Sequence, residues 1–141
     1  PPEGKGAILS MKAALKDAGM QPEEIDYVNV HGTSTPLGDI AELKAVAGVF
    51  GDHVYDLNIS STKSMTGHLL GATGAIEALA CILALTRGVV PPTINVEELD
   101  PEIDAKLNLT LGKAQHRDVK AAMSNTFGFG GHNSTIIFRK F

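Results

Sequence analysis

Apolar positions along this chain follow two different periods, which predict a succession of helices and strands. Apolar residues three and four positions apart predict helices, the first of which ends at Gly19. Short runs rich in β-branched and aromatic residues, such as IDYVNVH, predict strands. The predicted helices cover residues 6–18, a segment from Pro36 onward and residues 72–86, and the predicted strands cover residues 25–31, 57–61, 107–111, 121–126 and 134–138. This order predicts an α/β fold in which helices cover a mixed sheet.

The helix predicted over residues 72–86 has almost no polar face. A helix that is apolar on all sides is expected to be buried on all sides. A domain of 141 residues with one sheet would leave one side of this helix facing solvent. We therefore expect a partner subunit, or the remainder of a longer chain, to cover it.

Composition excludes several classes of protein. The length fits one domain, residues 1–141, and the hydrophobic fraction of 43% is that of a soluble globular protein. A net charge of −4 provides no basic field for nucleic acid or an anionic membrane. The single cysteine, Cys81, excludes an internal disulfide and suits a reducing compartment. Because the sequence begins with PPEGKG and lacks an initiator methionine, we expect a fragment or a processed piece.

Three segments rich in glycine and hydroxyl groups carry the candidate chemistry. Residues 31–35 (HGTST) and 61–74 (STKSMTGHLLGATG) each follow a predicted strand and precede a predicted helix, and residues 125–133 (NTFGFGGHN) join the last two strands. The carboxyl ends of strands in an open α/β sheet usually present ligand-binding groups. A helix N-terminus keeps a nearby histidine neutral, and a neutral imidazole donates an N–H to an oxygen that gains negative charge.

Each segment also has a purely structural interpretation. The first could be a turn with an N-cap threonine, and the glycines of the second could simply allow a helix to pack closely against the sheet. The third could be an ordinary glycine hairpin with two core phenylalanines. Two histidine-bearing turns at equivalent strand ends nevertheless favour a shared site.

The sequence predicts no metal site. Its histidines and Cys81 show neither C-x-x-C nor H-E-x-x-H spacing, and the glycine loops match neither the P-loop nor the dinucleotide-binding pattern. His53 and His116 lie among polar loop residues, so we expect them to be solvated. Cys81 is expected to be a small core residue rather than a nucleophile.

In this order, VNVHGTSTPLGD, SSTKSMTGHLLGATGAIEA and SNTFGFGGHN closely resemble the β-ketoacyl-acyl carrier protein synthases of dissociated fatty acid synthesis. The resemblance covers essentially all 141 residues. It implies a thiolase-like architecture, in which two similar α/β halves stack as five layers (αβαβα), with this chain as the C-terminal half. The family's nucleophilic cysteine belongs to the N-terminal half, and Cys81 does not align with it. The isolated chain is therefore expected to be inactive.

The resemblance also implies roles for individual residues. His31 and His68 match the two catalytic histidines, and Lys63 matches the active-site lysine. Glu42, in G-D-x-x-E, matches an acid associated with that lysine.

Further matches concern the substrate. Thr33 and Thr35 match threonines that hydrogen-bond the phosphopantetheine arm, and Phe129 matches a gating phenylalanine whose backbone N–H contributes to an oxyanion hole. The implied reaction is the decarboxylative condensation of malonyl-carrier protein with an enzyme-bound acyl thioester. No metal or organic cofactor is expected, since acyl carrier protein brings the phosphopantetheine. The resemblance further implies a homodimer in the cytoplasm, or in an organellar stroma or matrix.

Three other interpretations compete with this one. A non-catalytic chain-length factor shares the fold, but such proteins typically lose catalytic residues, and His31, Lys63 and His68 are all present. A thiolase would carry a second cysteine in the final glycine loop, where this sequence has phenylalanines and a histidine. A self-contained ligand-binding domain would not need the apolar helix.

Overall fold

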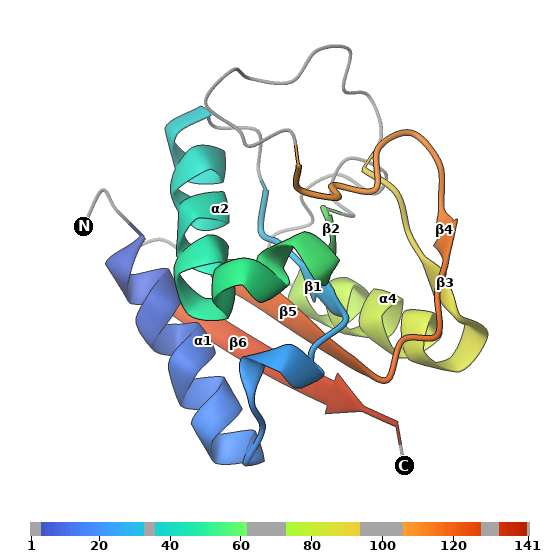
Figure 1. Ribbon diagram of the computed structural model, residues 1–141, viewed down its shortest axis with the longest axis horizontal. Coiled ribbons are helices and arrows are strands. Elements are labelled where there is room, and N and C mark those ends of the chain that lie inside the picture. Colours follow the sequence, from blue (N-terminus) through green and yellow to red (C-terminus); the bar gives the residue numbers. More distant parts are fainter. Residues whose placement is uncertain (1–3, 33–35, 62–72, 94–105, 128–132, 141) are drawn as a thin grey trace.

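A mixed four-stranded sheet forms the centre of the protein (Figure 1). The computed structural model describes residues 4–32, 36–61, 73–93, 106–127 and 133–140. The strands lie in the order β2 (Asn58–Ser60), β1 (Tyr27–Asn29), β5 (Ala121–Phe127) and β6 (Asn133–Arg139). Strand β1 is parallel to both β2 and β5, whereas β6 returns antiparallel to β5. The predicted mixed sheet is confirmed.

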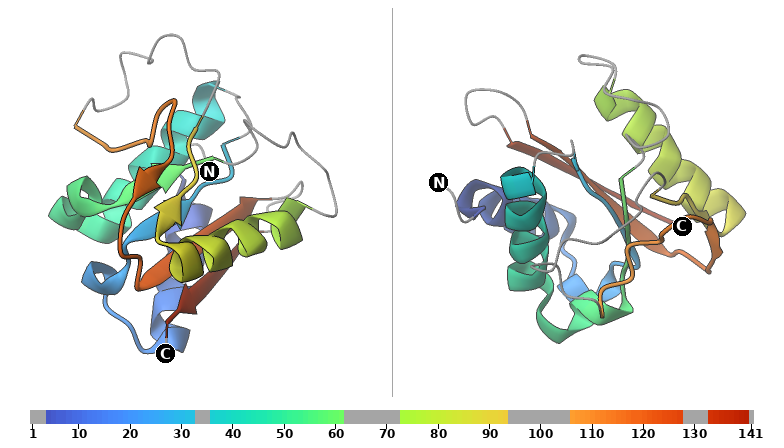
Figure 2. Two further views of the ribbon diagram at one scale, coloured as in Figure 1. Left: turned by 90° about the vertical axis from the view of Figure 1, so that its right-hand side faces the viewer. Right: turned by 90° about the horizontal axis from the view of Figure 1, so that it is seen from above.

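Helices cover both faces of the sheet and give three layers (Figure 2). Helices α1 (Lys5–Ala18) and α2 (Pro36–Phe50) lie on one face, and α4 (Thr73–Arg87) lies on the other. Two short 3-10 helices, η1 (Pro22–Glu24) and η2 (Gly51–Asp56), precede β1 and β2. All three predicted helices are present, with ends within a residue or so of the expected positions.

The first helix shows why the sequence pattern predicts its position well. Its apolar positions Ala7, Met11 and Leu15 are buried against the sheet. Gly19 ends the helix with a φ of +66°, which glycine adopts without the steric cost of a Cβ. The N–H of Met20 then donates to the carbonyl of Leu15 at 3.0 Å, and both side chains are buried in the core.

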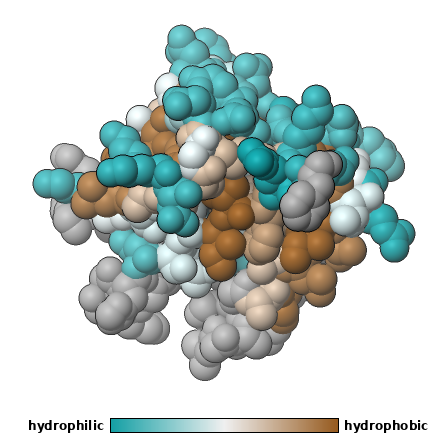
Figure 3. All heavy atoms as spheres, turned by 90° about the horizontal axis from the view of Figure 1, so that it is seen from below, coloured by the Kyte–Doolittle hydropathy of each residue, from teal (hydrophilic) through white to brown (hydrophobic). Residues whose placement is uncertain are grey.

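The core has two parts, one on each side of the sheet. The larger part lies beneath α1 and α2, and the smaller part lies beneath α4. On the outer face of α4, Leu79, Ile82 and Leu83 are exposed by 54%, 40% and 46%. This exposure was expected, because a single sheet covers only one side of the helix. Ile136 on the neighbouring edge strand is also exposed, and apolar side chains gather on the side of the molecule seen in Figure 3.

The fold differs from the sequence predictions at two places. Residues 107–111 do not form a strand, because only two isolated bridges, Asn58–Asn108 and Thr93–Leu111, hold them. The chain turns between these bridges at Thr110, whose φ of +53° is rare for a β-branched residue. The pattern also missed the two-stranded sheet of β3 (Val89–Val90) and β4 (Gln115–His116), since strands of two residues carry no readable period.

No helix in the described part of the chain is both long and apolar enough to cross a bilayer.

Candidate functional site

The three polar segments all begin at one edge of the sheet. Strands β2, β1 and β5 are parallel neighbours, so their carboxyl ends meet at the same edge. The segment that starts with His31 follows β1, the segment that starts with Ser61 follows β2, and residues 128–132 connect β5 to β6. The prediction that both histidine-bearing turns leave equivalent strand ends is therefore confirmed for the positions where they begin.

Of the predicted site residues, the structure describes His31 and Glu42. The remaining ones lie outside the described residues, and their predicted roles stay predictions: Thr33, Thr35, Lys63, His68 and Phe129.

Glu42 holds the backbone at the end of β1. Its side chain projects from α2 and is buried, with 4% of its surface exposed. The two carboxylate oxygens accept the main-chain N–H of His31 at 2.8 Å and that of Gly32 at 3.1 Å. Hydrogen bonds to a carboxylate are stronger than those between neutral groups. The orientation of the His31 peptide is thus fixed by a side chain eleven positions later in the sequence.

This contact was not foreseen from the sequence. The resemblance pairs Glu42 with Lys63, which lies outside the described residues, and this pairing stays a prediction; the structure shows the carboxylate of Glu42 bound to two main-chain donors. One signal was available. Glu42 follows His31 by eleven positions and lies near the start of the predicted helix. A side chain there can reach back to the free N–H groups of the residues that precede the helix.

Gly32 is needed because Ser61 lies directly against it. Its φ is +41°, and a Cβ placed on it would lie 2.8 Å from both Cβ and Oγ of Ser61. The hydroxyl of Ser61 donates to the carbonyl of Gly32 at 3.1 Å. The glycine therefore brings the two polar segments together at their origins, in addition to making the turn expected from the sequence.

A buried polar network lies beneath this edge, within the sheet. The Tyr27 hydroxyl hydrogen-bonds Ser60 Oγ at 2.8 Å and accepts the amide N–H of Asn29 at 3.1 Å. Burial raises the pKa of the Tyr27 phenol well above its ordinary value. Its hydroxyl therefore stays protonated and ties β1 to β2.

Cys81 is a core residue, as predicted. Its side chain is fully buried in α4. Burial, and then the nearby carboxylate of Glu77, raise the pKa of the Cys81 thiol to about 12. A thiol must ionise to attack, so Cys81 is no nucleophile at neutral pH.

The two loop histidines differ from each other. His116 is exposed, as expected. The prediction of a solvated His53 is wrong, since its ring is only 15% exposed and its Nε2 lies 2.7 Å from the carbonyl of Ile25. No local pattern indicates that η2 folds back onto Ile25, two residues before β1.

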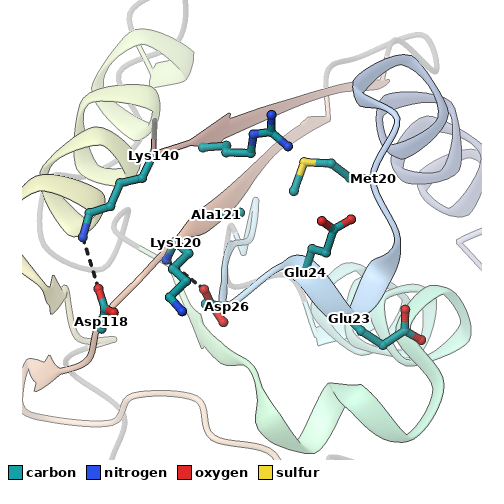
Figure 4. Close-up of a pocket in the computed structure, with 9 residues that line it drawn as sticks. Met20, Glu23, Glu24, Asp26, Asp118, Lys120, Ala121 and Lys140 are labelled. Carbon is teal, nitrogen blue, oxygen red and sulfur yellow. Dashed lines mark hydrogen bonds and ion pairs between the residues drawn. The ribbon is translucent and has the colours of Figure 1, made fainter.

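A surface hollow lined by described residues lies at the opposite edge of the sheet, where β1 and β5 begin (Figure 4). It is lined by Met20, Glu23, Glu24, Asp26, Asp118, Lys120, Ala121, Arg139 and Lys140. Several of its charges are already paired, including Lys140 with Asp118 at 3.1 Å. Asp26 accepts the main-chain N–H of Lys120 and also pairs with Arg117. Part of the charge around the hollow is thus used in contacts within the fold.

Among the described residues, no group of three or more histidine, cysteine, aspartate or glutamate side chains could hold a metal ion.

Solved structures of ketosynthases superimpose on this chain, which places its sheet, with polar segments after the parallel strands, in the thiolase-like class. Residues 1–97 match the family model described as Beta-ketoacyl synthase, C-terminal domain, and the chain belongs to this family. It is 50% identical over 140 residues to 3-oxoacyl-[acyl-carrier-protein] synthase 2 of Synechocystis sp. and 51% identical to the protein of the same name in Staphylococcus aureus. In both comparisons 99% of this chain aligns with 33% of the relative, so the chain spans about a third of the length of these proteins.

Solved structures agree with this assignment. A β-ketoacyl synthase from Burkholderia phymatum is 45% identical and superimposes with a TM-score of 0.87, over 95% of this chain and 32% of that one. A type II polyketide ketosynthase, solved in complex with its acyl carrier protein, is 35% identical with a TM-score of 0.93, over 100% of this chain and 34% of that one. The thiolase-like fold is confirmed.

Proposed function

We propose that this chain supplies the decarboxylating groups of a 3-oxoacyl-[acyl-carrier-protein] synthase that elongates fatty acyl chains. The main support is that His31 and the segment containing Lys63 and His68 follow neighbouring parallel strands at one edge of the sheet. The high identity to synthases of this name supports the same reaction. It also disfavours the alternative of a non-catalytic chain-length factor.

In the proposed reaction, the thioester carbonyl of malonyl-carrier protein accepts an N–H from His31 and one from His68. The bond between the α-carbon and the carboxylate breaks, CO₂ leaves, and the electron pair forms an enolate whose oxygen carries negative charge. Two oriented neutral donors stabilise this oxygen better than water does, because they need no reorganisation. Glu42 contributes by fixing the peptide of His31. Lys63 orients His68.

The enolate carbon then attacks the acyl thioester on a cysteine of the synthase outside this sequence. This attack forms the new carbon–carbon bond and a tetrahedral oxyanion, which is held by main-chain N–H groups that include that of Phe129. When the intermediate collapses, the carbonyl re-forms, the carbon–sulfur bond breaks and the cysteine thiolate leaves. Thr33 and Thr35 hydrogen-bond the phosphopantetheine arm. This scheme needs no metal or organic cofactor of the enzyme's own.

Acyl carrier protein is the proposed partner. The polyketide ketosynthase that this chain resembles was solved with such a carrier, which supports the assignment. We further propose that the synthase acts as a homodimer in the cytoplasm or in an organellar stroma or matrix.

A synthase chimaera tests the function. In it, these 141 residues replace the matching third of the Staphylococcus aureus relative. We expect the chimaera to release CO₂ from malonyl-carrier protein, and the His31→Ala variant to release it at least about a hundredfold more slowly. Transfer of an acyl group onto the cysteine should remain within a few-fold of the parent.

The exposed histidine of β4 provides the matched control, and His116→Ala should decarboxylate at the parental rate. Unchanged decarboxylation in the His31→Ala variant would refute the donor role. A folded chimaera that accepts the acyl group but never decarboxylates malonyl-carrier protein would refute the proposed function itself.

A further inference from the structure

A hydrogen bond joins the two polar segments of the site close to the ends of the strands that they follow. Ser61 is the residue after β2, and it is buried, with 7% of its surface exposed. Its hydroxyl donates to Gly32 in the segment after β1, at 3.1 Å. Its main-chain N–H donates in the other direction, to Thr93 Oγ1 at 3.1 Å. Ser61 is thus held from both sides at the point where the second segment begins.

Thr93 is itself fixed by its backbone. Its N–H donates to the carbonyl of Thr110 at 2.9 Å, and its carbonyl accepts the N–H of Gly112 at 2.9 Å. Thr110 is the residue with the unusual φ of +53°. Its hydroxyl donates to Ile59 of β2 at 3.1 Å and its N–H to the side chain of Asn108. Rare backbone conformations persist only where the surroundings determine them strongly.

A continuous path therefore connects the two origins of the site. Glu42 holds His31 and Gly32, Gly32 accepts from Ser61, and Ser61 donates to Thr93. The close approach of Gly32 to Ser61 leaves no space for a side chain between them. A shift of Ser61 would move the start of one segment relative to the other.

We propose that Ser61 and Thr93 are positioning residues that set the relative placement of the two histidine-bearing segments. This inference rests on the proposed function, in which one substrate carbonyl accepts from both His31 and His68. Two donors on one oxygen require a fixed separation, and displacements of about 1 Å at an active site can cost on the order of a hundredfold in rate. The pair touches no reacting atom and acts only through the segments that it anchors.

The test uses the synthase chimaera with Thr93→Val, which keeps the shape of the side chain but leaves the Ser61 N–H without its acceptor. We expect malonyl decarboxylation to fall about tenfold or more, while the rate of cysteine acylation stays within about twofold of the parent. Thr93→Ser restores the acceptor and should recover most of the decarboxylation rate. Should Thr93→Val fail to fold, Ser61→Ala provides a second variant, which removes the hydroxyl that donates to Gly32.

Tyr27→Phe is the matched control, because it removes a buried hydroxyl between the same two strands without touching either segment. It should lower thermal stability and leave decarboxylation close to parental. Parental decarboxylation in Thr93→Val or Ser61→Ala, no recovery in Thr93→Ser, or an equal loss in Tyr27→Phe would each overturn the positioning role. Failure of the parent chimaera to decarboxylate would instead count against the proposed function.

Discussion

The carboxylate of Glu42 and the main-chain N–H of His31 lie 2.8 Å apart, so a helix side chain determines how the peptide after β1 is oriented. The second carboxylate oxygen binds Gly32 in the same way. The imidazole of His31 is carried on a backbone that cannot rotate without breaking both bonds. In the proposed function, the rigidity of the His31 donor is therefore provided by a residue that need not meet the substrate.

Replacing Glu42 by glutamine keeps the shape of the side chain and removes its charge. In the synthase chimaera, Glu42→Gln retains one acceptor oxygen but turns an NH₂ donor toward a main-chain donor. We expect the free energy of unfolding to fall by about 1–3 kcal/mol and decarboxylation to slow with it. Urea unfolding and CO₂ release measure the two effects. Glu24→Gln is the control, because Glu24 also binds a main-chain N–H, that of Gln21 at 2.7 Å, but at an exposed site; an equal loss in both variants would contradict the special role of Glu42.

A side chain at Gly32 should disturb the junction of the two segments. Gly32→Ala combines a left-handed φ, which costs about 1–2 kcal/mol, with a clash against Ser61 that adds about 1–3 kcal/mol. Gly51→Ala isolates the first effect, because Gly51 has a φ of +57° and nothing within 4 Å of its added Cβ. We expect Gly32→Ala to lose clearly more unfolding free energy than Gly51→Ala, and to lose decarboxylation as well. Similar losses of stability would show that the contact with Ser61 is easily relieved.

Cys81 should resist alkylation in the folded protein. The pKa of its thiol is raised to about 12 from an ordinary value of 9.0, because the side chain is buried and lies near Glu77. The resulting contribution to stability is complete below pH 9.0 and is lost as the pH rises through about 12. At pH 8, iodoacetamide should label the Cys81 peptide rapidly in denaturant and very slowly without it, as measured by mass spectrometry. Equal labelling rates in the two conditions would contradict the burial of this thiol.

Arg117 should contribute to stability through several acceptors at once. Its guanidinium donates to the carbonyls of Asp26 and Asp56, to the Asn58 side chain at 3.2 Å and to the Asp26 carboxylate at 3.1 Å. Arg117→Lys loses this planar arrangement, and we expect a loss of about 1–3 kcal/mol in the free energy of unfolding.

An exposed ion pair provides the comparison for Arg117. Lys140 lies 3.1 Å from Asp118, with side-chain exposures of 44% and 71%. Lys140→Gln should therefore change the unfolding free energy by less than about 1 kcal/mol. A loss as large as that of Arg117→Lys would contradict the comparison. Urea titration of the chimaera measures both variants.

The sequence predicts the longer elements well because their patterns are local. Helix α1 repeats its apolar residues at helical spacing and ends at a glycine, and α2 begins at the proline that suits a first helical turn. Strand β6 contains three successive β-branched residues, Thr135, Ile136 and Ile137, which fit a sheet. Strand β3 and the bridged segment around Thr110 depend instead on partners distant in the sequence, which no local pattern reveals.

The sequence predicts the location of the candidate site but not the contacts within it. Glycine and histidine after predicted strands indicated that the edge of the sheet carries the chemistry, and the parallel pairing of β2, β1 and β5 agrees. The spacing of Glu42 after His31 was the one signal of their contact, and no pattern in the sequence revealed the role of Ser61. Both depend on how α2 and β2 are placed beside β1, which is decided by tertiary packing.

The parallel pairing of β1 with β5 has a consequence for how the nascent chain folds. Tyr27 lies opposite Ala122, so one edge of β1 stays unpaired until most of this sequence has been synthesised. Contacts between such distant residues form slowly, because a long loop must close first. An open strand edge meanwhile offers its N–H and C=O groups to any other chain. The early β1–α2–β2 unit is therefore the stage of synthesis at which this protein most needs protection from aggregation.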